Sequence, residues 1–98
     1  MENLEIDRQN LITDMEKVIE INNINLNIIG EDATEFTLDT VDLLFLNDLT
    51  LVSLKDEQRF INNCENNPNY LNKTKELVST LLNIMQKTHK MLVDETVN

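Results

Sequence analysis

Four pairs of adjacent apolar residues recur at seven-residue intervals in the last third of the chain, and this spacing constrains the fold more than any other feature. Seven residues make almost two turns of an α-helix, so all four pairs fall on one side of a single helix. Asn67 is a suitable N-cap and Pro68 suits a first helical turn, so we expect one long helix over residues 68–94. The pairs are Tyr70/Leu71, Leu77/Val78, Ile84/Met85 and Met91/Leu92.

The apolar stripe of this expected helix is too broad for a two-stranded coiled coil. Leu71 and Leu81 take heptad core positions, but the flank that a coiled coil usually fills with charge is apolar too. Three apolar positions in seven are typical of a helix packed in a bundle or globular core. We therefore expect most of the stripe to be the protein's own core, with an uncovered end that suits a second copy or another partner. The residues assigned to this oligomer or partner surface are Leu77, Ile84, Met91 and Leu92.

Three other segments have the spacing or the signals of helices. Residues 4–21 carry apolar side chains at intervals of three and four, which predicts an amphipathic helix. Residues 41–54 form the most apolar segment, with Asp39 or Thr40 as its cap, and we expect it to be the central helix, buried on nearly all sides. A capping-box pattern at Ser53 predicts a break there, followed by a short helix that ends near Asn66.

Residues 24–38 leave two interpretations open. Ile24 to Ile28 alternate apolar and polar residues, and Phe36-Thr37-Leu38 do so again after a loop that contains Gly30. This pattern fits a short β-hairpin that packs on the helices, because a lone two-stranded hairpin is only marginally stable. It fits equally an irregular connection whose apolar side chains fall into the core.

Length and composition limit the chain to one domain, residues 1–98. A chain of 98 residues with 41% hydrophobic residues can build a single modest core, and one glycine and one proline favour long regular elements. Cys64 is the only cysteine, and the first residues lack the basic and apolar regions of a signal peptide, so we expect a cytoplasmic protein. The longest apolar run is too short and too often interrupted to cross a membrane.

The net charge of −10 is distributed unevenly along the chain. Residues 1–66 carry a net charge of −11 and residues 67–98 carry +1, and no basic residue occurs between Lys17 and Lys55. Such a field repels nucleic acid and anionic membranes and favours a partner with a basic surface. The acidic residues that we assign to this partner surface are Glu31, Asp32, Glu35, Asp39, Asp42 and Asp48.

Catalytic, metal and cofactor motifs are hard to find in this sequence. Cys64 and His89 are the only residues of their types. We interpret Cys64 as a thiol on the apolar side of a helix and His89 as an imidazole at a helix surface, which is a simpler explanation than a nucleophilic pair. The acids beside Gly30 lack the spacing of an EF-hand, and one glycine cannot build a phosphate-binding loop. We expect neither an enzyme nor a cofactor.

These observations predict an all-α fold, a small antiparallel bundle of three to four helices with a long C-terminal helix. The functional hypothesis is a non-enzymatic module that binds a protein with a basic surface, as an anti-defence or antitoxin-like inhibitor would. Small phage and mobile-element proteins that disable nucleases often present such a surface, an analogy of size and charge alone. The alternative hypothesis is a self-assembling structural or scaffolding subunit, a homodimer for instance, that associates through its C-terminal helix.

Overall fold

The computed structural model describes residues 4–30 and 38–97, together with the side chains of residues 4–30 and 46–94. The described chain forms four helices, α1 (Leu4–Ile29), α2 (Leu38–Lys55), α3 (Glu57–Asn66) and α4 (Tyr70–Val97), and no strand occurs in these ranges. The molecule is elongated, with extents of 51 × 22 × 18 Å. The predicted all-α bundle with a long C-terminal helix is confirmed.

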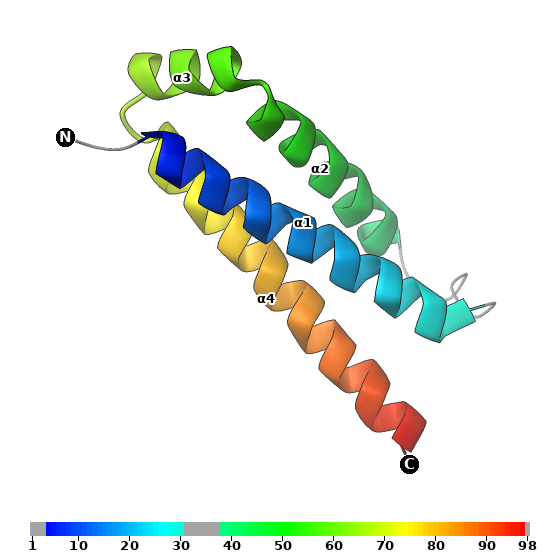
Figure 1. The fold of residues 1–98 in the computed structure, drawn as a ribbon. Helices are drawn as coiled ribbons and strands as arrows, with labels where there is room; N and C mark the ends of the chain where they lie inside the picture. The colour runs from blue at the N-terminus through cyan, green and yellow to red at the C-terminus, as the bar shows by residue number, and fades with distance from the viewer. Residues whose placement is uncertain (1–3, 31–37, 98) are drawn as a thin grey trace.

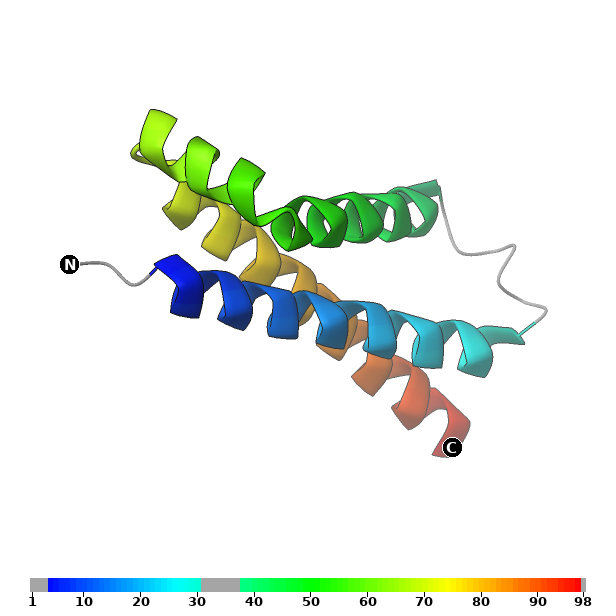
Figure 2. The same cartoon turned by 45° about the horizontal axis from the view of Figure 1, so that its top comes forward.

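Helix α1 lies in the middle of the bundle. It packs against α2 on one side and α4 on the other, whereas α2 and α4 have little direct contact. Figure 1 shows α2 running antiparallel to α1 and α4 running in the same direction as α1. Helix α3 connects α2 to α4 at one end of the bundle. Figure 2 shows α4 crossing behind α1 and diverging from α2 toward its C-terminus. Side chains from all four helices build the core: Leu11, Ile12, Met15, Val18, Leu54, Phe60, Val78, Leu81 and Met85.

The prediction that residues 41–54 form the central helix is wrong, because α1 takes that place. Apolar content alone suggested a helix surrounded on all sides, but α2 covers only one side of α1. Its outward residues Leu49 and Val52 are 50% and 66% exposed. The most apolar segment therefore exposes apolar side chains to solvent.

The first helix is longer than expected, and the hairpin interpretation is wrong for its first arm. Residues 24–29 continue α1, Ile24 is 41% exposed rather than in the core, and the helix ends before Gly30. Gly30 has a φ of 60°, the left-handed conformation with which helices commonly end. Residues 31–37, where the turn and most of the second arm were expected, lie outside the described residues, and Leu38 begins α2.

The two short junctions differ by a few residues from the expected caps. The helix break comes at Asp56 instead of Ser53, and the Asp56 carboxylate accepts a hydrogen bond from the Arg59 backbone N–H at 3.2 Å, so Asp56 is the N-cap of α3. Asn67 ends α3 rather than beginning the long helix, and its Oδ1 accepts from the Asn69 N–H at 3.0 Å. Helix α4 therefore begins at Tyr70.

The seven-residue stripe packs as predicted over most of α4. Val78, Leu81 and Met85 are buried in the core, and Tyr70 meets the ring of Phe60 edge-on with centroids 6.0 Å apart. An ion pair between Lys75 Nζ and Asp7 Oδ1 at 3.3 Å joins the start of α4 to the start of α1. The broad stripe is thus mainly the protein's own core.

Candidate functional site

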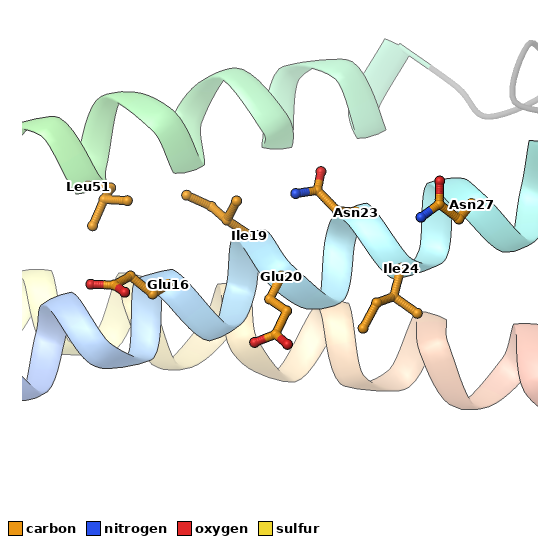
Figure 3. Close-up of a pocket in the computed structure, with 7 residues that line it drawn as sticks. All are labelled: Glu16, Ile19, Glu20, Asn23, Ile24, Asn27 and Leu51. Carbon is orange, nitrogen blue, oxygen red and sulfur yellow. The ribbon is translucent and has the colours of Figure 1, made fainter.

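A shallow groove between α1 and α2 combines apolar and acidic side chains. It has a volume of about 400 Å³ and opens widely to solvent. In Figure 3, Ile19 and Asn23 extend from α1 toward α2, Leu51 lies beside Ile19, and Glu20 and Ile24 extend away from α2. The lining residues are Glu16, Ile19, Glu20, Asn23, Ile24, Asn27 and Leu51.

The helical register explains why this groove is both apolar and acidic. Leu51 and Ile19 are half-buried where the two helices meet, whereas Glu16 and Glu20, one turn apart, are exposed on the outer side of α1. None of the lining residues named above is basic, and no basic residue occurs in the sequence between Lys17 and Lys55. An apolar floor with carboxylates beside it suits a ligand that is both apolar and cationic.

The predicted acidic surface is described only in part. Glu31, Asp32 and Glu35 lie outside the described residues, and Asp39 and Asp42 lie in the first turns of α2. Of the six, Asp48 alone has a described side chain, and it is exposed. Asp39 was expected as a cap, but α2 begins one residue earlier, at Leu38. The predicted surface did not include Glu16, which precedes the interval without basic residues, or Glu20, which lies within it.

The four residues of the predicted apolar surface on α4 differ in exposure. Ile84 and Met91 are 37% and 64% exposed, whereas Leu77 and Leu92 are half-buried. Leu77 and Leu49 line a second hollow of about 200 Å³ where α2 and α4 approach each other. Of these four residues, only Ile84 and Met91 therefore offer substantial apolar surface.

Cys64 and His89 lie at different ends of the bundle. Cys64 belongs to α3, which is near the start of α1, because the Glu57 carboxylate lies 4.0 Å from the Arg8 guanidinium. The Nδ1 of His89 lies 3.0 Å from the Asn25 Oδ1, near the end of α1. Arg8 and Asn25 are separated by about 26 Å of helix, so the fold does not bring this cysteine and histidine together.

Polar side chains occupy several positions in the core. Arg8 is buried, and its Nη1 donates to the Leu54 carbonyl at 3.1 Å near the end of α2. Asn25 is buried as well and donates to the Met85 carbonyl at 3.3 Å. Asn22 and Asn47 are fully buried, and within the described structure the Asn22 Nδ2 and both Asn47 amide atoms have no hydrogen-bond partner.

Glu5 is the one described carboxylate with a clear electrostatic perturbation. Hydrogen bonds from the Arg8 guanidinium, the closest at 3.0 Å, lower the pKa of Glu5, and Gln9 adds a further bond. The pair lies at the first turns of α1 beside α3, away from the groove. Its effect is therefore on the helix junction.

Within residues 4–30 and 38–97, no group of three or more histidine, cysteine, aspartate or glutamate residues is arranged so that it could hold a metal ion. None of the helices described combines the length and the apolar character that a bilayer crossing demands. No protein-family model matches the chain, and comparisons with curated proteins and with solved structures also give no match.

Proposed function

We propose that the protein is a non-enzymatic binding module whose acidic groove between α1 and α2 receives a basic segment of another protein. The observation that carries this proposal is the placement of Glu16 and Glu20 beside the apolar floor of Ile19 and Leu51. An inhibitor that covers a basic, nucleic-acid-binding surface of its target would need such a groove. An anti-defence or antitoxin-like role is the biological form that we propose.

The chemistry of the groove suits lysine and arginine side chains. Their methylene stems can lie on Ile19 and Leu51 while their charged ends reach the exposed carboxylates. Asn23 and Asn27 add amide groups that can hydrogen-bond to a partner's backbone or side chains. The net charge of −10 accelerates the approach of a cationic partner, most strongly at low salt.

Capture experiments with matched charge variants test this proposal. The bait is the wild-type protein, the groove variant Glu16→Lys/Glu20→Lys, or the control variant Glu65→Lys/Glu76→Lys, which makes the same charge change at exposed positions of α3 and α4. Mass spectrometry should identify a protein that binds the wild type and the control but not the groove variant, and that is released by high salt. Equal capture by all three baits, or retention at high salt, would contradict the proposal.

Self-assembly through α4 is the second candidate function, and the exposure of Met91 favours it. Met91 is 64% exposed and lies two turns beyond Ile84 on the same side of the helix. Light scattering coupled to gel filtration should then show an oligomer that Met91→Asp dissociates. A wild-type protein that remains monomeric at high concentration excludes this candidate.

A further inference from the structure

The outward face of α2 is an apolar surface that the bundle leaves uncovered. Leu46, Leu49 and Val52 are 36%, 50% and 66% exposed, while the opposite side of the helix buries Asn47 and Leu54. Val52 and Leu49 are three residues apart, and the sequence continues their spacing at positions 45, 41 and 38, all apolar. Apolar residues thus follow this register of α2 from position 38 to position 52, over about 21 Å of helix.

Two exposed charges of opposite sign border this apolar face on one flank. Asp48 and Lys55 are both exposed and are seven residues apart, so they take the same heptad position beside Val52. A two-fold axis perpendicular to the helices relates two antiparallel α2 helices and places a flank of one beside the same flank of the other. In that arrangement each Asp48 falls near the Lys55 of the other copy, whereas in a parallel pair the two charged flanks lie on opposite sides of the contact and the charges stay unpaired.

We propose that a second copy of this chain covers the C-terminal half of the outward face of α2, so that the two α2 helices pack antiparallel there about a two-fold axis. Leu49 of each copy packs against Val52 of the other, and two symmetric ion pairs join Asp48 to Lys55. The complementary charges on the face itself favour a second copy over a uniformly basic partner. This inference does not depend on the proposed function, because the carboxylates of the α1–α2 groove lie on α1.

Charge exchange on α2 is the direct test of this dimer. Sedimentation analysis from micromolar to near-millimolar concentration should give a monomer–dimer equilibrium. Asp48→Lys and Lys55→Asp should each weaken dimerisation about tenfold, because each brings like charges together at two symmetric places. The double variant Asp48→Lys/Lys55→Asp should restore the dissociation constant of the wild type, since it only exchanges the partners.

Variants in the apolar face separate this dimer from the other interfaces. Val52→Asp should weaken dimerisation at least about 100-fold, because it buries an unpaired carboxylate twice. Met91→Asp on α4 and Glu16→Lys/Glu20→Lys on α1 should leave the dimer intact, and circular dichroism should show an unchanged helix content in every variant. A protein that stays monomeric over the whole range, a dimer dissociated by Met91→Asp alone, or a double charge variant without restoration would overturn the inference.

Discussion

Asn47 offers the sharpest test of how the core is built, because its replacement should stabilise the protein. The side chain is 0% exposed, and neither amide atom has a hydrogen-bond partner among the described residues. A buried unsatisfied polar group costs about 1–3 kcal/mol, and an apolar side chain there gains about 1.5–3 kcal/mol by transfer from water. Allowing about 1 kcal/mol for added volume, we expect Asn47→Leu to raise the free energy of unfolding by about 1.5–5 kcal/mol.

The matched control is the same substitution at Asn25, which is equally buried but hydrogen-bonded. Asn25 donates to the Met85 carbonyl at 3.3 Å and lies 3.0 Å from the His89 Nδ1. Asn25→Leu makes the same apolar gain but removes both contacts, so we expect its free energy of unfolding to lie about 2–4 kcal/mol below that of Asn47→Leu. Urea unfolding followed by circular dichroism, at one protein concentration, measures both changes. If Asn47→Leu destabilises the protein, or if the Asn25→Leu variant is as stable as the Asn47→Leu variant, the reasoning is refuted.

Three further predictions concern the helix junctions. Arg8→Met should lower the free energy of unfolding, measured in urea, by about 2–3 kcal/mol, because it removes the hydrogen bond to the Leu54 carbonyl. The control Arg59→Met, at an exposed position, should change the free energy of unfolding by less than about 0.5 kcal/mol. Equal effects of the two substitutions would contradict the buried role of Arg8. The lowered pKa of Glu5 means that its contribution to stability is complete above its ordinary value of 4.5 and is lost as the pH falls through the folded-state value. Glu5→Gln should therefore flatten the acid side of the stability profile from urea titrations, and an unchanged profile would argue against the Arg8 pairing. Asp56→Ala should cost about 1 kcal/mol and Asp56→Asn much less, because asparagine also caps helices; equal losses in thermal unfolding would show that the cap does not matter.

The helices with a regular apolar spacing could be predicted from the sequence, and the places where polar residues enter the core could not. The repeat from Tyr70 to Leu92 located α4 because its buried residues Val78, Leu81 and Met85 are all apolar. The second half of α1 was missed because asparagines at positions 22 and 25 fill its core positions, so the remaining isoleucines resemble the alternation of a strand. The spacing of residues along one helix cannot show whether a polar side chain in the core will find a hydrogen-bond partner in a distant part of the chain.

The candidate site was predictable in its charge and not in its position. The absence of basic residues between Lys17 and Lys55 correctly drew attention to an acidic part of the chain. Which carboxylates border a groove depends on how α1 and α2 pack, and that packing brought in Glu16 and Glu20. Apolar content likewise did not reveal that Val52 faces outward, because exposure depends on which neighbours a helix finds.

The position of α1 between two partners has a consequence for synthesis on the ribosome. Its contacts with α4, such as Asp7 with Lys75 and Asn25 with His89, join residues more than sixty positions apart. A nascent chain that has emerged only as far as α3 can pair α1 with α2, but Val18 and the neighbouring core residues lack their packing against α4. The apolar surface between α1 and α4 is therefore buried only after α4 has been synthesised. A chain arrested before that stage should bind hydrophobic dyes or chaperones.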